Sequence, residues 1–161
     1  MIRTDERGCR LSGANAAAAE LYEHALIAAC SWRNGADALA LAAQREAPDF
    51  VMAHLLPAWL LVCSRDPRRV QSARAIVARA MRLPANDGER AHMAALCAVL
   101  GDHYELAKAL LGEQLTREPR DLLALQFAHA LDHVTGDTPR MLERVERLLR
   151  PGPAICRAAT R

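Results

Sequence analysis

The residues best suited to metal chemistry are two histidines near the end of the chain. His129 and His133 are four positions apart, so they share one face of a helix, and an aspartate directly precedes His133. A zincin-type site needs glutamate directly after the first histidine, and this position holds Ala130. A third ligand would have to come from another helix, with His92 and His103 as candidates. A metal-dependent enzyme therefore ranks below a pair of histidines that line a helix surface, and we expect no resident metal or cofactor.

No other pattern indicates catalysis. The four serines lie outside any Gly-x-Ser-x-Gly turn, and the chain has no Gly-x-Gly-x-x-Gly or P-loop sequence. His54, His92 and His129 are expected on the first helices of successive hairpins. Because buried imidazoles need hydrogen-bond partners, we expect each to bond to a neighbouring repeat rather than to a ligand. We predict that the protein is not an enzyme.

Composition narrows the classes of fold and partner. The chain has 161 residues, of which 52% are hydrophobic and 4% aromatic, and a composition rich in Ala, Leu, Arg and Glu favours an all-α fold. The net charge of +2 comes from interleaved acids and bases, which argues against nucleic acid as a partner. The longest apolar run, residues 51–63, is shorter than the roughly 20 residues that a membrane span needs. Five scattered cysteines and a charged N-terminus predict a cytoplasmic protein, without a membrane partner and with mostly buried, reduced cysteines.

A repeat of about 34 residues organises the chain. The set Ala107, Leu111, Gln114 and Pro119 recurs 34 residues earlier as Ala73, Val77 and Ala80, recurs 34 residues later as Met141, Val145, Leu148 and Pro153, and has a weaker copy in Ala36, Ala40, Ala43 and Pro48. Such a period predicts stacked helical hairpins, with small residues where the second helix crosses the first. We predict a right-handed α-solenoid of about four tetratricopeptide-like hairpins over residues 15–150. Residues 1–14 are then a polar lead-in and residues 151–161 an irregular tail.

Capping and breaking residues divide the repeat region into eight helices. The expected helices cover about residues 15–30, 36–47, 50–63, 67–82, 89–100, 102–117, 121–135 and 138–150. Asn15, Asp49, Asp66 and Asp121 are the expected N-caps, since a side-chain oxygen at this position accepts from an unpaired backbone N–H.

Four segments in order suggest a family. They are residues 47–54, 88–92, 118–125 and 136–141, which read APDFVMAH, GERAH, EPRDLLAL and GDTPRM. Together they resemble the N-terminal part of the tetratricopeptide repeat protein 38-like family, over about residues 5–150. The resemblance implies a helical repeat fold and a general binding role, and it implies no catalytic residues. The chain departs from this family after Arg150, so residues 151–161 are interpreted as a frameshifted or truncated end.

These observations predict a protein–protein interaction scaffold, whose concave groove of first helices binds a peptide or a partner domain. The inward positions lack the Lys and Asn of a carboxylate clamp, so a mostly apolar groove for a helix or an extended peptide is expected. The predicted partner contacts are Leu55, His92, Leu96, Gln126, Ala130 and His133.

Self-association is the alternative. The expected last helix carries Met141, Val145 and Leu148 on a face more apolar than one neighbour would cover. Repeat arrays normally end in a polar capping helix, and this one does not. A homodimer through this face, or a truncated repeat fragment without its own activity, is the second hypothesis.

Overall fold

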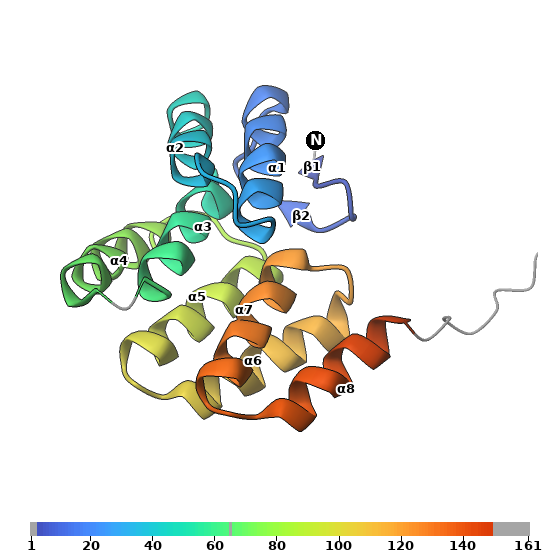
Figure 1. Cartoon of the computed structure of the whole chain (residues 1–161). Helices are drawn as coiled ribbons and strands as arrows, with labels where there is room; N and C mark the ends of the chain where they lie inside the picture. The colour runs from blue at the N-terminus through green and yellow to red at the C-terminus, as the bar shows by residue number, and fades with distance from the viewer. Residues whose placement is uncertain (1–2, 65, 150–161) are drawn as a thin grey trace, which may run out of the picture.

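The computed structural model describes residues 3–64 and 66–149, with the backbone alone for the last two, as helices preceded by a small β-hairpin (Figure 1). The predicted tail, residues 151–161, lies outside the described residues, as does the side chain of Leu148. The all-α prediction is confirmed. Within the described parts, no helix combines the length and the apolar character needed to cross a membrane.

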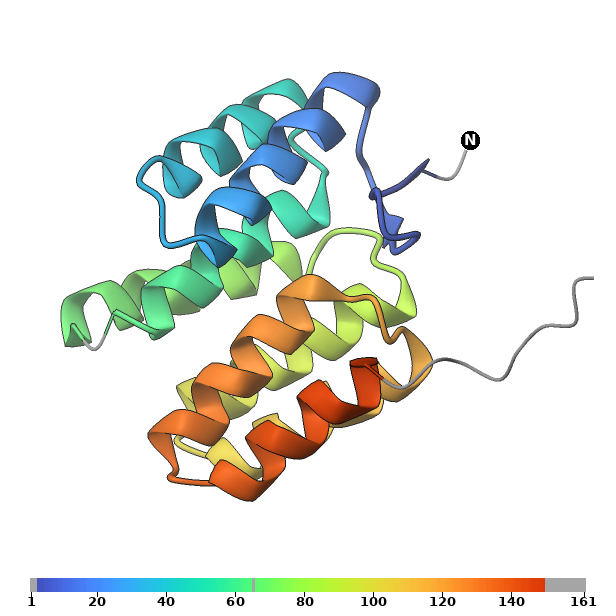
Figure 2. The ribbon, with the colours of Figure 1, turned by 45° about the vertical axis from the view of Figure 1, so that its right-hand side comes forward.

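Eight helices are described, and their ends agree with the predicted ones to within two residues. They are α1 (Ala16–Cys30), α2 (Ala36–Glu46), α3 (Val51–Val62), α4 (Pro67–Ala80), α5 (Asp87–Leu100), α6 (Tyr104–Arg117), α7 (Leu122–Val134) and α8 (Thr138–Leu149). Consecutive helices pack against each other, and α1 and α3, α3 and α5, and α1 and α7 also make contact (Figure 2).

The repeated small residues lie where the helices of a hairpin meet. Ala40 in α2, Ala73 in α4 and Ala107 in α6 have no exposed surface, and the other helical members of these three repeat copies are buried as well, whereas Pro48 and Pro119, which follow the helices, are exposed. A larger side chain at these positions would separate the two helices. The repeat copy in α8 differs, because Met141 is half-buried and Val145 is exposed.

Three of the four predicted N-caps are confirmed. The side chains of Asn15, Asp66 and Asp121 accept hydrogen bonds from backbone N–H groups two or three residues later, at 2.8 to 2.9 Å. The Asp49 prediction is wrong, because the N-cap of α3 is Phe50 and no side chain caps it. Instead, the first N–H of α3, on Val51, donates to the carbonyl of Ser12 at 3.1 Å, so the N-terminal segment does the capping.

This N-terminal segment is not a free lead-in. Strands β1 (Arg3–Thr4) and β2 (Arg10–Leu11) pair antiparallel, with Arg3 opposite Leu11. Asp5 closes the loop between them, since its Oδ1 accepts from the backbone N–H groups of Arg7 (2.9 Å) and Cys9 (2.8 Å). We call residues 3–13 the strap. It packs against the helices, and its Leu11 is 4% exposed.

A buried ionic network attaches α8 to the rest of the array. Lys108 in α6, the single lysine of the chain, is 1% exposed and donates to Glu105 (2.8 Å), Thr135 (3.0 Å) and Asp137 (2.9 Å). Arg144 in α8 donates through Nε to Oδ2 of the fully buried Asp132 in α7, at 2.6 Å. The last helix is therefore fixed by paired charges as well as by apolar packing.

Candidate functional site

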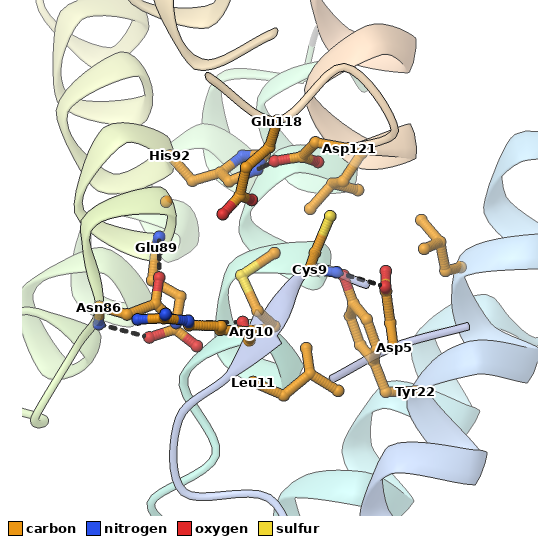
Figure 3. Close-up of a pocket in the computed structure, with 14 residues that line it drawn as sticks. Asp5, Cys9, Arg10, Leu11, Tyr22, Asn86, Glu89, His92, Glu118 and Asp121 are labelled. Atoms are coloured by element: carbon orange, nitrogen blue, oxygen red, sulfur yellow. Dashed lines mark hydrogen bonds and ion pairs between the residues drawn. The ribbon is translucent and has the colours of Figure 1, made fainter. Parts of the chain in front are cut away.

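The strap lies in a site formed by four helices. The helix residues that line it come from the first helices of the hairpins: Tyr22 and Leu26 of α1, Met52 of α3, Glu89 and His92 of α5, and Leu123 of α7, with Glu118 and Asp121 just before α7. Figure 3 shows the strap between them, with Cys9 pointing toward Glu118 and Asp121 and with Leu11 beside Tyr22. The remaining cavity is about 10 Å³, which is room for about one water molecule. We call this set of helix residues the strap site.

The site binds the strap partly through hydrogen bonds to the strap's backbone. The N–H of Ser12 donates to Oε1 of Glu89 at 2.7 Å, and the carbonyl of Arg10 accepts from Nδ2 of Asn86 at 3.0 Å. Asn86 and Glu89 also form the capping box of α5, in which Glu89 Oε2 accepts from the Asn86 N–H at 2.9 Å. The same two side chains therefore cap the N-terminus of α5 and form hydrogen bonds with the backbone of the strap.

Two strap side chains make specific contacts. The guanidinium of Arg7 donates to both carboxylate oxygens of Glu23 in α1, at 2.8 and 2.5 Å, and the two side chains are 19% and 11% exposed. This is the bidentate geometry in which arginine and carboxylate match best. Leu11 fills the apolar part of the site, next to the buried ring of Tyr22. An arginine and a leucine four residues apart thus anchor the strap.

Asp121 connects three elements beneath the strap. Its Oδ1 caps α7 through the N–H of Ala124 (2.9 Å), and its Oδ2 accepts from Nε2 of His92 (2.9 Å) and Nε2 of Gln114 (3.0 Å). Burial alone would raise the pKa of Asp121, but interaction with His92 and these hydrogen bonds lower the pKa to about 2. The carboxylate is therefore ionised at every physiological pH.

The tautomer of His92 follows from its two partners. The indole Nε1 of Trp59 can only donate, and it lies 3.2 Å from Nδ1 of His92, so this nitrogen accepts. Nε2 then carries the proton that it donates to Asp121. Trp59 itself stacks on Phe127 of α7 with the ring centres 4.7 Å apart. The chain of hydrogen bonds from Trp59 through His92 to Asp121, which we call the relay, therefore lies in the core.

The side chains of Cys9, Glu118 and Asp121 form a candidate metal site, because their ligand atoms lie within 4.8 Å of one another. Burial raises the pKa of the Cys9 thiol, and the nearby carboxylates of Asp121, Asp5 and Glu118 raise it further. The thiol is therefore protonated, whereas a thiolate is the form that binds a metal. Asp121 is already committed to three hydrogen bonds. We assign no metal to this group.

His129 and His133, the pair considered as metal ligands, have no third ligand side chain close to them among the described residues. His129 donates from Nε2 to the carbonyl of Met141 at 3.0 Å, and His133 is exposed on the same helix. In the described part of the chain, the group of Cys9, Glu118 and Asp121 is the one set of three metal-ligand side chains found close together. The expectation that these histidines bond to a neighbouring repeat is confirmed for His54 (Pro48 carbonyl, 2.9 Å) and His92. It is wrong for His129, because Met141 lies in the second helix of the same hairpin.

The predicted contact residues do not form one surface. Leu55 and Leu96 have no exposed surface and His92 is 1% exposed, so a partner does not reach these side chains while the fold stays closed. The reason is that this face of the first helices is covered by neighbouring helices and, at His92, by the strap. Gln126 and Ala130 are half-buried on α7, and His133 is exposed near its C-terminal end.

Sequence reasoning missed the strap itself. Its turns were visible in the sequence, since Gly8 lies within the stretch from Asp5 to Leu11 and Gly13 lies two residues after it. Gln114, which stands in the repeat position that Ala43 and Ala80 occupy in other copies, was a signal for the polar group around Asp121. The prediction of mostly buried cysteines is also wrong within the described residues, because Cys63 and Cys97 are exposed.

Comparison with protein-family models, with curated proteins and with solved structures finds no match for this chain. The case for a function therefore depends on the geometry of the site.

Proposed function

We propose that this protein is an interaction scaffold that binds an extended segment of a partner protein at the strap site. The four hairpins are taken to stack as a right-handed solenoid of tetratricopeptide-like repeats, and the first helices α1, α3, α5 and α7 supply the binding surface. The resemblance to the tetratricopeptide repeat protein 38-like family and a cytoplasmic location are part of the same proposal. No covalent step is involved.

The occupancy of the site by residues 3–13 carries this proposal. The Asn86 side chain donates to the strap backbone and the Glu89 side chain accepts from it, the Glu23 carboxylate binds Arg7, and an apolar hollow holds Leu11. These are the components of peptide recognition by extended chains: backbone bonds for affinity and pockets for alternate side chains for selectivity. A surface that binds its own strap in this way has the chemistry to bind a similar segment from another chain.

Gly13 gives a way to test the proposal. Its φ is +78°, and a Cβ atom added to it would lie 2.1 Å from the carbonyl oxygen of Asp49, so Gly13→Ala should expel the strap. Gly35→Ala is the matched control, because φ is +96° there and nothing lies within 4 Å of an added Cβ. A fluorescent peptide of residues 3–14 should bind Gly13→Ala, measured by anisotropy, and should bind Gly35→Ala much more weakly. A folded Gly13→Ala protein that binds no peptide would contradict the proposal.

Self-association through α8 is the second candidate, and one observation favours it. Leu142 is 61% exposed and Val145 is 37% exposed on the same helix, while Arg144 between them is held in the buried network. Light scattering over a concentration series tests it. A dimer that is lost when Leu142 and Val145 are changed to glutamate would support this candidate, and a monomer at all concentrations would remove it.

A further inference from the structure

We infer that the partner segment carries an arginine in a tight turn and, four residues later, a leucine in the extended stretch that follows the turn, and that residues 3–13 are a tethered competitor for it. This inference rests on the proposed function and specifies the chemistry of the partner.

The helix residues around the strap are acidic, which favours a cationic partner segment. Glu23, Glu89, Glu118 and Asp121 of the helix framework surround the strap, and the helix residues that line the site include no lysine or arginine in the part of the chain that is described. Glu89 and Asp121 are 1% and 6% exposed, so their charges are shielded little by solvent. A cationic segment is therefore favoured over an anionic one at this surface.

The positions of the anchoring side chains along the strap specify the order of residues in the partner segment. Residues 5–9 form the turn of the hairpin and residues 10–11 are strand β2. In this stretch, residues 5, 7, 9 and 11 are half-buried or buried while residues 6, 8 and 10 are exposed. Arg7 in the turn meets the carboxylate of Glu23, and Leu11 in the strand meets the apolar hollow. Between them, Cys9 faces Glu118 and Asp121 as a small, neutral thiol. The site therefore selects a cation in a turn, a small residue where the turn ends and a leucine in the strand that follows.

The strap is covalently joined to the helices, so it competes with any partner segment for the site. The strap leaves the site through Gly13, where both the positive φ and the contact with the Asp49 carbonyl allow only glycine. A tethered segment competes at a high effective concentration, so an external peptide binds the closed protein only in proportion to the open fraction. Displacement of the strap by a stronger ligand of the same pattern would expose the site without unfolding the helices.

The experiment measures the binding of labelled peptides to the full-length protein by fluorescence anisotropy. The peptide of residues 3–14 is compared with versions that carry Arg7→Glu or Leu11→Ala. With the Gly13→Ala protein, each substitution should weaken binding about tenfold or more, because each removes one anchor. The wild-type and Gly35→Ala proteins should bind the unsubstituted peptide at least about tenfold more weakly than Gly13→Ala, owing to the tether.

A charge exchange tests the arginine contact from the protein side. Adding Glu23→Arg to Gly13→Ala should restore binding of the Arg7→Glu peptide, whereas adding Glu20→Arg, at an exposed position of the same helix, should not. Circular dichroism and thermal unfolding establish that each variant is folded before binding is measured.

The outcomes separate this inference from the proposed function. Equal binding of all three peptides to Gly13→Ala would overturn the inferred partner chemistry and leave peptide binding intact. No binding of any peptide to the folded variant would overturn both. A concentration-dependent dimer of the wild type that Gly13→Ala abolishes would assign the site to the strap of a second copy, and would overturn the inference of a foreign partner.

Discussion

Replacing Asp121 with asparagine tests the relay beneath the strap. Asparagine keeps the size of the side chain and can still cap α7 through Oδ1, but it places an amide N–H₂ group where Oδ2 now accepts from His92 and Gln114. Gln114 can turn its amide to present its oxygen. His92 cannot adapt in this way, because Trp59 holds its Nδ1 as an acceptor and Nε2 must carry the proton.

The expected loss follows from these contacts. One hydrogen bond to a buried charged acceptor is removed, and a buried donor on His92 is left unpaired, which costs about 2–3 kcal/mol of unfolding free energy. For a chain of this length, 1 kcal/mol corresponds to about 2–4 °C, so Tm should fall by roughly 4–12 °C. Asp66→Asn is the matched control, because Asp66 is also an N-cap aspartate but its side chain accepts from an exposed backbone N–H, that of Arg68. It should change the unfolding free energy by less than about 0.5 kcal/mol.

The pH dependence gives a second measurement of the same group. The folded pKa of Asp121 is about 2 and its ordinary value is 3.8. Because the folded pKa is the lower one, the ionised carboxylate contributes about 2 kcal/mol above pH ~4, and this contribution is lost as the pH falls toward 2. Urea unfolding followed by circular dichroism at pH 7, 4 and 2.5 should show that Asp121→Asn reduces this acid-dependent loss. Equal stabilities of Asp121→Asn and Asp66→Asn at pH 7, with unchanged acid sensitivity, would refute the reasoning.

Two further changes test the attachment of α8 and the strain in a turn. Lys108→Met should lower the unfolding free energy by about 3 kcal/mol in urea denaturation, because it removes the cation facing the fully buried Asp132; Arg90→Met, which breaks an exposed pair, should cost less than about 1 kcal/mol, and similar costs for both would contradict the network. Trp32 is 87% exposed with φ of 55°, a left-handed conformation that costs a non-glycine residue about 1–2 kcal/mol, so Trp32→Gly should raise the unfolding free energy by roughly 0.5–1 kcal/mol, and a loss would show that the indole makes a stabilising contact.

The helices were predictable because their signals are local. Caps such as Asn15 and Asp66 lie next to the N–H groups that they satisfy, and the alanines of the repeat mark where the second helices cross. The Asp49 prediction failed because Val51 finds its acceptor in Ser12, which is distant in sequence. No local pattern carries this information.

The site was predicted less well than the fold. The expected bond to a neighbouring repeat was found for His54 and His92, and Asp121 was expected as a cap, but the bonds of Asp121 to His92 and Gln114 depend on how α5, α6 and α7 meet. The contact residues were placed on an open groove because the period of the repeats says nothing of what covers the first helices. Leu55 and Leu96 lie in the core, and the strap covers the adjoining site.

The central claim is that the strap is a ligand of the site that can leave while the helices stay folded. Native-state amide hydrogen exchange by NMR measures this directly, with the Ser12 and Cys9 N–H groups reporting on the strap and the Trp59 and Leu96 N–H groups on helices α3 and α5. The account predicts that the strap amides exchange through a local opening of lower free energy than the core amides, and that Gly13→Ala accelerates the strap amides far more than the core. If the strap amides instead exchange only with global unfolding, at the same free energy as the core, the strap is a structural part of the fold and the account is contradicted.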